Sequence, residues 1–458
     1  MDNIFKTLLT LDPNFKFGAA TSNLQIEGAL DKGDRGKSIW DDTLIKINKE
    51  ACNHYEKYRE DLDLLKEMGL SCYRCSIGWS RIMPDGKNIS EDGIKFYNDL
   101  FYYATSLGIQ VWVTLYHWDL PLALQEEFNG WLSPKIIPYF TNFADTCFKN
   151  FGHLVKNWIT FNEPYVFCHY GYGVGQCPPF ITGQEFTANH HVLLAHKAVY
   201  DLYKNNYSDH SGPSDHSGPS DHSGPSDHSG QIGIVLNCAW REPFSDSKLG
   251  QAPLEEDIKA TKYAIESRFD RFALPIVEGR YPDCLKEEFK DMIFAKSSGF
   301  NRPLNTDFIG LNYYTLKRVK ADKEKIYIDV PSGPEDKKNF MGWAVKPEGL
   351  GKLIRHAHNL FKDTPIYITE NGFCDEGKLN DPDRIDYIQS HLLEICECIS
   401  KYGIPIKGYF CWSLTDNIEW GFGTGPHFGL IHIDFSDPER KRTKKSSYKW
   451  IQNLLNSL

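Results

Sequence analysis

The sequence predicts an α/β protein that folds as a single (β/α)8 barrel. Runs rich in β-branched and aromatic residues alternate with amphipathic helical stretches, and eight such runs occur along the 458 residues. Polar residues also follow nearly every run, as expected where a site lies at the carboxyl ends of barrel strands. A doubly wound open sheet is the alternative that the alternation by itself leaves open.

Eight apolar runs are expected to be the buried strands. They cover residues 15–21, 72–79, 111–117, 155–161, 231–237, 308–314, 366–369 and 406–412. Helical periodicity fills the intervals, with examples at residues 54–68, 135–151, 191–204 and 384–402. Apart from one repeat at residues 208–230, no stretch rich in glycine, serine or proline divides the chain, so residues 1–458 are expected to form one (β/α)8 domain.

One segment differs from the rest in composition. Residues 208–230 contain the unit SDHSGP three times and then SDHSG, without a single apolar residue. Such a segment cannot contribute to a core, so we expect a low-complexity surface loop. Its four histidines, His210, His216, His222 and His228, leave a metal-binding tract as the alternative, but their even spacing in a loop favours no coordination shell, and no metal is expected.

Charge and composition exclude several classes of protein. Lys and Arg number 51 and Asp and Glu 61, so the net charge is −10, which disfavours nucleic-acid and anionic-membrane partners. No apolar run approaches the roughly 18 residues of a membrane span, and the first residues lack the basic start of a secretory signal. With 12 scattered cysteines, we expect a cytoplasmic protein. A homo-oligomer stays open.

Two glutamates are the sharpest candidates for catalysis. Glu163 and Glu370 each follow an apolar strand, in NWITFNE and PIYITE. In a barrel, both carboxyl groups would face the same mouth. Two opposed carboxyl groups are what cleavage of a glycosidic bond needs, because one protonates the leaving oxygen and the other meets the developing positive carbon. Structural carboxylates that cap helices or pair with arginine are the alternative.

The residues around these strand ends are typical of a sugar site. Three tryptophans could stack on the C–H faces of a sugar ring, namely Trp118, Trp412 and Trp420. Four polar side chains could bind hydroxyl groups, namely Gln25, His117, Asn162 and Glu419. The glycine-rich stretch 421–425 follows no strand–helix turn and lacks a phosphate-loop lysine. No cofactor is therefore expected.

These motifs resemble glycoside hydrolase family 1, the β-glucosidase family. The matching segments, in chain order, are FGAATSNLQIEGA, YRCSIGWSRI, TLYHWDLP, TFNEP, DFIGLNYYT, ITENG and WSLTDNIEWGFG. The resemblance covers the chain apart from the histidine repeat. It implies a (β/α)8 barrel and a retaining hydrolase for β-linked glycosides that acts by double displacement on a small-molecule substrate.

The resemblance also implies individual roles. Glu163 matches the acid/base and Glu370 the nucleophile. Arg74 and Tyr314 match residues that contact the nucleophile, and Asn312 matches their neighbour. The residues that match sugar-binding or aglycone-side positions are Gln25, His117, Asn162, Trp343, Trp412, Glu419 and Trp420.

Other functions stay as alternatives. A transglycosylase differs only in the acceptor that reaches the intermediate. A 6-phospho-β-glycosidase is disfavoured because Glu419-Trp420 matches the pattern for unphosphorylated sugars, and a non-catalytic sugar-binding barrel is disfavoured because both glutamates are present. Glucosides are the expected substrates, with galactosides, fucosides and the natural aglycone left open.

Overall fold

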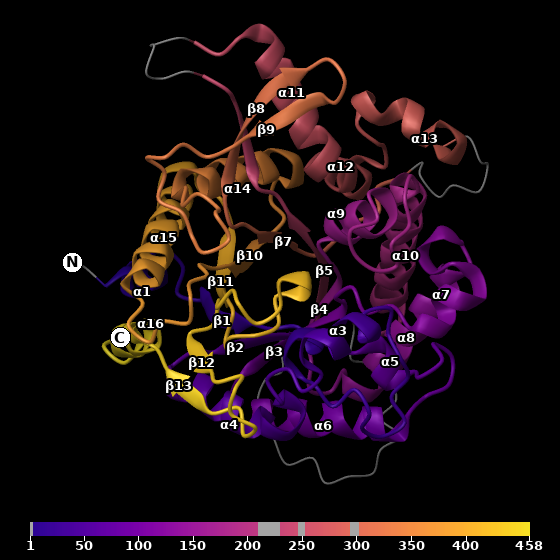
Figure 1. Ribbon diagram of the computed structural model, residues 1–458, viewed down its shortest axis with the longest axis vertical. Helices are drawn as coiled ribbons and strands as arrows, with labels where there is room; N and C mark the ends of the chain where they lie inside the picture. Colours follow the sequence, from indigo (N-terminus) through magenta and orange to yellow (C-terminus); the bar gives the residue numbers. More distant parts are fainter. Residues whose placement is uncertain (1–2, 209–229, 246–251, 294–301) are drawn as a thin grey trace.

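The computed structural model describes residues 3–208, 230–245, 252–293 and 302–458 (Figure 1). Eight parallel strands close into a barrel in the order β1-β11-β10-β7-β5-β4-β3-β2. They are β1 (Lys16–Ala20), β2 (Cys72–Ser76), β3 (Gln110–Tyr116), β4 (Asn157–Asn162), β5 (Gln231–Asn237), β7 (Ile309–Asn312), β10 (Ile366–Asn371) and β11 (Ile406–Trp412). The predicted (β/α)8 barrel is therefore confirmed, and the open sheet is excluded.

Helices surround the barrel, and most connect one strand to the next (Figure 1). The longer ones are α4 (His54–Glu67), α6 (Glu91–Ser106), α8 (Ile136–Phe151), α10 (Glu185–Asn206), α11 (Glu255–Ile265), α14 (Pro347–Phe361), α15 (Pro382–Tyr402) and α16 (Ser446–Leu455). The shorter ones are α1 (Ile4–Leu11), α2 (Asn23–Ile26), α3 (Asp41–Asn48), α5 (Trp79–Ile82), α7 (Leu122–Phe128), α9 (Pro164–Phe167), α12 (Arg271–Glu278) and α13 (Lys286–Ile293).

Local sequence signals explain where helices begin. In α6 the Ser90 hydroxyl accepts a hydrogen bond from the Gly93 amide, and Glu91 and Asp92 lie in the first turn. A capping side chain satisfies a free amide, and acidic residues there interact favourably with the helix dipole.

Within the described ranges, two small sheets lie outside the barrel. One consists of β6 (Trp240–Pro243), β8 (Leu316–Asp322) and β9 (Ile326–Val330), and the other of β12 (Ile431–Ile433) and β13 (Arg442–Lys444). In Figure 1, β8 and β9 lie beside α11 at the upper end of the view.

The barrel interior below the site is filled by large side chains. The Trp112 ring on β3 packs against Phe308, Tyr367 and Phe410, with ring centroids 5.4, 4.6 and 5.4 Å away. Gly18 on β1 makes room for this layer, since a Cβ there would lie 2.5 Å from the Phe410 ring. The closed floor confines ligands to the carboxyl ends of the strands.

Four strand boundaries differ from the prediction by two or more residues, and the first is the start of the strand predicted at residues 155–161, which begins at Asn157. The second predicted strand, residues 72–79, ends at Ser76, because Trp79 begins α5 and its amide donates to the Asp119 carboxylate. The predicted strand at residues 308–314 ends at Asn312, and that at 366–369 continues through Asn371.

No helix in the described ranges is long and apolar enough to cross a membrane. Most of the SDHSGP repeat, residues 209–229, lies outside the described residues. Its flanks are described: α10 ends at Asn206, and β5 begins at Gln231. The repeat therefore joins a helix end to the amino end of a barrel strand.

Candidate active site

A cavity of about 1120 Å³ opens at the carboxyl ends of the barrel strands. Its lining includes twelve of the thirteen predicted site residues: Gln25, His117, Trp118, Asn162, Glu163, Asn312, Tyr314, Trp343, Glu370, Trp412, Glu419 and Trp420. The thirteenth, Arg74 on β2, does not line the cavity, but its fully buried side chain contacts the residues that do. The structure thus brings all the predicted residues to one place.

Glu370 is held by two donors. The Arg74 Nη1 lies 2.6 Å from one carboxylate oxygen, and the Tyr314 hydroxyl donates to the other at 2.8 Å. Burial and the charge of Glu370 raise the pKa of Tyr314 well above its ordinary value, so its phenol keeps its proton and remains a donor. Each oxygen of the Glu370 carboxyl group thus accepts a hydrogen bond from a fixed donor.

Glu163 has a different environment. It follows β4 with a φ of 49° and is buried. Its carboxyl group accepts one hydrogen bond, at 2.7 Å from the Asn312 amide. Burial, and then the negative charge of Glu370, raise the pKa of Glu163 to about 8. Glu163 is therefore protonated at neutral pH while Glu370 faces a cation.

Asn162 connects the two glutamates. Its Oδ1 accepts from Arg74 Nη2 at 2.7 Å and from Asn312 Nδ2 at 3.1 Å. Arg74 also contacts Glu370, and Asn312 also contacts Glu163. Both carboxyl groups are thus positioned by one buried network.

Sequence reasoning missed a residue of this network. Thr369 donates its hydroxyl to Asn312 Oδ1 at 2.7 Å, which orients the amide so that its nitrogen faces Glu163. Asn237, at the end of β5, is not among the predicted site residues, but it lines the cavity, and its Oδ1 has no hydrogen-bond partner among the described residues. The position of Asn237 at a strand end could have indicated a site residue, whereas nothing in the sequence around Thr369 indicates its role.

Gln25 and Glu419 line the cavity next to each other. Gln25 Nε2 lies 3.4 Å from the Glu419 carboxylate and donates to the Ile418 carbonyl at 2.9 Å. The Ser22 hydroxyl donates to Gln25 Oε1 at 2.6 Å and fixes the amide. Removal from water, and then the charge of Glu370, raise the pKa of Glu419 to about 8.

His117 is a neutral imidazole. Burial and the neighbouring Arg74 charge lower its pKa well below the ordinary value. Its Nε2 lies 3.1 Å from Asn162 Nδ2, and its Nδ1 has no protein partner among the described residues. A buried nitrogen without a protein partner in a cavity favours a polar ligand.

Tryptophans form the walls. The Trp118 and Trp420 rings lie 4.4 Å apart, and the Trp118 Nε1 donates to the Asn162 carbonyl at 3.0 Å. Trp412 lies almost parallel to His117, with centroids 6.1 Å apart. Trp343 stands 5.6 Å from Tyr314, on the side of the nucleophile. Gly372 permits the close approach of β11, since a Cβ there would lie 1.9 Å from the Trp412 carbonyl oxygen.

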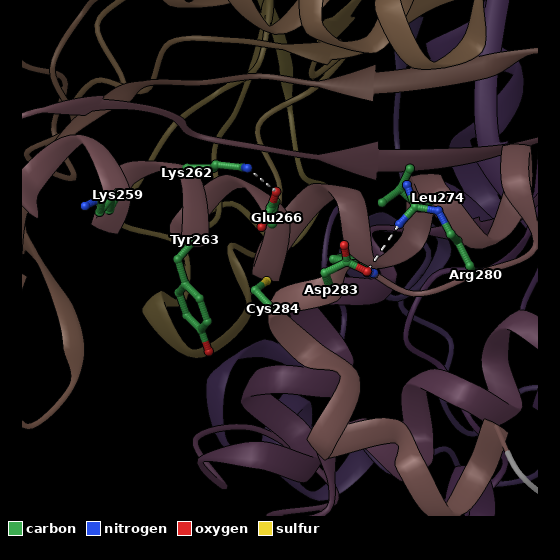
Figure 2. Close-up of a pocket in the computed structure, with 9 residues that line it drawn as sticks. Lys259, Lys262, Tyr263, Glu266, Leu274, Arg280, Asp283 and Cys284 are labelled. Atoms are coloured by element: carbon green, nitrogen blue, oxygen red, sulfur yellow. Dashed lines mark ion pairs between the residues drawn. The ribbon is translucent and has the colours of Figure 1, made fainter. Parts of the chain in front are cut away.

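A second hollow lies away from this cavity. It has a volume of about 610 Å³ and is formed by α11, α12 and the turns that follow (Figure 2). Two ion pairs lie along it, with Lys262 3.6 Å from Glu266 and Arg280 3.9 Å from Asp283. None of the predicted site residues, all within the described ranges, lines it.

One side-chain cluster has the composition of a metal site. Asp416, His427 and His432 place their ligand atoms within 4.8 Å of one another. Both imidazole Nδ1 atoms already bond Asp416 Oδ2, at 2.8 and 2.9 Å, and the buried Lys445 ammonium lies 2.7 Å from Oδ1. The Lys445 ammonium therefore pairs with the Asp416 carboxylate in the position where a metal cation would otherwise balance its charge.

Similarity to known proteins identifies the family of this chain. The model of glycosyl hydrolase family 1 matches residues 9–457. The chain belongs to glycosyl hydrolase family 1. Rice β-glucosidase 4 is 35% identical over 96% of this chain and 94% of its own length.

Solved structures agree with this membership. A rice β-glucosidase in a covalent complex with glucose superposes with a TM-score of 0.86 at 31% identity, over 96% of this chain and 98% of that one. An aphid myrosinase gives 0.85 at 30% identity, over 97% and 98%. This family 1 member is accordingly a β-glucosidase-type glycosidase that hydrolyses O-glycosidic bonds.

Proposed function

We propose that this glycosidase hydrolyses β-linked glucosides with retention of configuration, with Glu370 as nucleophile and Glu163 as acid/base. The observation that carries the proposal is the contrast between the two carboxyl groups. They line the same cavity, yet Glu370 contacts a guanidinium and a phenol, whereas Glu163 contacts one amide and has a raised pKa. Retention needs carboxyl groups about 5–5.5 Å apart, and we expect that separation here.

The first step uses each glutamate in the form that its surroundings favour. The Glu370 carboxylate attacks C1 of the sugar, the bond from C1 to the leaving oxygen breaks, and Glu163 gives its proton to that oxygen. The products are a glycosyl ester on Glu370 and a free aglycone alcohol.

The second step reverses the roles. Ester formation removes the charge of Glu370, which was one cause of the raised pKa of Glu163. Glu163, now a carboxylate, takes a proton from water, the water oxygen attacks C1, and the ester bond to Glu370 breaks. An acceptor alcohol in place of water gives transglycosylation by the same step.

The polar and aromatic residues that line the cavity around the two glutamates support an unphosphorylated glucoside as substrate. Gln25, His117 and Glu419 offer donors and acceptors for hydroxyl groups, and Trp412 and Trp420 offer flat apolar faces. A phosphate group on the sugar C6 would be a dianion, and an acidic side chain such as Glu419 next to it would disfavour binding of the phosphorylated sugar. β-Galactosides and β-fucosides remain alternatives for the same residues.

A substrate panel tests the sugar. Aryl β-glucoside, β-galactoside, β-fucoside and 6-phospho-β-glucoside with one common aryl group should be compared by kcat/KM. We expect the glucoside to lead and the phosphorylated sugar to be the poorest. Preference for the 6-phospho sugar, or no turnover of any member, would contradict the proposal.

We also propose a cytoplasmic location. All 12 cysteines are free thiols, and ten of them are buried, such as Cys75 and Cys147. Reducing compartments preserve such thiols. Cell fractionation with an antibody to the chain tests this, and recovery in a secreted fraction would contradict it.

A further inference from the structure

One wall of the active-site cavity carries a group of cations. Arg241 on β6, Lys317 on β8 and Arg268 in the helical turn before α12 all line the cavity. Asp329 on β9 lines the cavity as well, and it forms ion pairs with Arg241 and Lys317. The group stands out because the chain as a whole has a net charge of −10.

Asp329 is already committed to one cation. Arg241 Nε and Nη2 donate to its two carboxylate oxygens at 3.0 and 3.1 Å, a two-pronged contact that neutralises both partners. Lys317 reaches only to 3.6 Å of the same carboxylate, and its side chain is 42% exposed. Arg241 and Lys317 are also register partners on neighbouring strands, where like charges repel.

Arg268 has spare donors. Its Nε donates to the Tyr327 hydroxyl at 2.7 Å, and its guanidinium lies 5.0 Å from the centre of the Tyr165 ring. The other carboxylates close by are paired elsewhere, since Asp270 binds His356 and Glu242 binds Lys352. Lys317 and Arg268 therefore remain as two cations that no carboxylate among the described residues neutralises fully.

The wall lies on the leaving-group side of the catalytic glutamates. Asn237 on β5 pairs in register with Asn312, whose amide donates to Glu163, and Asn237 leads through Cys238 and Ala239 to Arg241. Tyr165, beneath the Arg268 guanidinium, follows Glu163 by two residues. Glu163 protonates the departing oxygen in the proposed mechanism, so the aglycone extends from Glu163 toward this wall.

We propose that this wall is a binding site for an anionic oxygen group on the aglycone, so that the preferred substrates are β-glycosides of acidic aglycones. The inference rests on the proposed function, because it concerns the leaving group of that reaction. The guanidinium fork of Arg268 suits a carboxylate or another oxyanion, and the Lys317 ammonium adds a point charge. Because the Lys317 side chain is partly exposed, salt screens its charge, and the preference should weaken as ionic strength rises.

Matched substrate pairs test this proposal. Aryl β-glucosides carrying a 4-carboxylate, or a 4-(2-carboxyethyl) group for longer reach, are compared with the near-isosteric neutral amides. The quantity measured is the ratio of kcat/KM for acid over amide. For at least one of the two substrate lengths, we expect a wild-type ratio of about ten. This ratio should fall at high ionic strength. Ratios of one or less at both lengths would overturn the proposal.

Variants assign the effect to the wall. Arg268→Gln and Lys317→Gln should each lower the acid-to-amide ratio by several-fold, and the double variant should abolish the preference. Lys320→Gln, which removes a charge from the exposed side of the same strand β8, should leave the ratio at its wild-type value. A ratio is insensitive to the amount of folded enzyme, so partial misfolding of a variant does not hide the result.

The outcomes also separate the two proposals. If the amides are hydrolysed and the ratios do not respond to Arg268→Gln or Lys317→Gln, the anionic site is wrong and the glycosidase proposal stands. If neither acid nor amide glucoside is hydrolysed, the proposed function itself fails.

Discussion

Two residues of the same type perform opposite tasks because their neighbours differ. The Glu370 carboxylate lies between Arg74 and Tyr314, while Glu163 is buried with one amide donor and the charge of Glu370 nearby. Opposite charge stabilises a carboxylate, whereas burial and like charge stabilise its protonated form. The assignment of nucleophile and acid follows from these contacts.

The pH dependence of kcat/KM tests this difference. Because Glu163 must be protonated in the free enzyme and its pKa is raised to about 8, we expect activity to be lost as pH rises through the alkaline side of neutrality. In Glu163→Gln, assayed with a dinitrophenyl glucoside that needs no acid, the alkaline limb should disappear. An unchanged alkaline limb in that variant would assign it to another group.

Removal of the acid/base gives a second prediction. Glu163→Ala should lose about 10²–10⁴-fold in kcat/KM for glucosides with poor leaving groups. For activated aryl glucosides, the first step should be spared and the second slowed. Added azide should then speed breakdown of the intermediate and yield β-glucosyl azide. Absence of this product, or an α-azide, would refute the acid/base role of Glu163.

Sequence reasoning reached the residues that have a local signature. Glu163 and Glu370 follow apolar strands in recognisable motifs, and their partners could be predicted from the same segments. Thr369 reads as an ordinary strand residue, although it orients Asn312. Arg268 lies in a helical stretch far from any barrel strand, and only the tertiary fold brings it into the cavity.

At the scale of elements, polar contacts decide where strands end. The strand predicted at residues 366–369 stops before Glu370, because charged residues are disfavoured in buried strands. In the structure β10 continues through Asn371, whose side chain bonds the Tyr313 carbonyl at 2.7 Å and the Tyr409 hydroxyl at 2.8 Å. Tyr409 lies on β11 and Tyr313 directly follows β7, so the sequence of β10 alone could not reveal these compensating partners.

The loop that carries Glu419 is tied down by Asp416. Its buried carboxylate accepts from the Lys445 ammonium, the imidazoles of His427 and His432, and the Gly429 amide. Although burial opposes it, the Lys445 charge and the two imidazole hydrogen bonds hold the pKa of Asp416 well below its ordinary value. Asp416 therefore stabilises the fold above its unfolded pKa of about 3.9, and this contribution is lost as pH falls through the lower folded value.

The neighbouring lysines 444 and 445 provide a matched pair of variants. Lys445→Met should lower the free energy of unfolding by about 3–5 kcal/mol at neutral pH, because it leaves a buried carboxylate without its cation. The loss should shrink toward pH 4, because Asp416 in the variant no longer faces the Lys445 charge and becomes protonated at a higher pH than in the wild type. Lys444→Met breaks an exposed pair with Glu67, whose side chains are 32% and 50% exposed, and should cost at most about 1 kcal/mol. Equal losses in urea unfolding would contradict the account.

At the scale of the whole molecule, the active site and the SDHSGP repeat lie at opposite ends of the barrel. The site occupies the carboxyl ends of the strands, and Trp112 with its neighbours closes the interior beneath it. The SDHSGP repeat joins the end of α10 to the start of β5, at the opposite ends of the strands. Insertions there are remote from the substrate.

Trimming the repeat to one copy tests this separation. We expect unchanged kcat and KM on an aryl glucoside, and a gain in stability of about 1 kcal/mol at most from the shorter loop. A large fall in kcat in a variant whose unfolding curve matches the wild type would show that the repeat acts on the site.

The measurement closest to the central claim is covalent trapping of the nucleophile. The enzyme is incubated with 2,4-dinitrophenyl 2-deoxy-2-fluoro-β-glucoside, whose fluorine slows breakdown of the glycosyl ester, and the labelled peptide is sequenced by mass spectrometry. We predict that each enzyme molecule releases one equivalent of dinitrophenol in a burst and carries one fluoroglucosyl group on Glu370. The variant Glu370→Gln should carry no label. A sugar attached to Glu163 or another side chain, or turnover that leaves the protein unlabelled, would contradict a double displacement through Glu370.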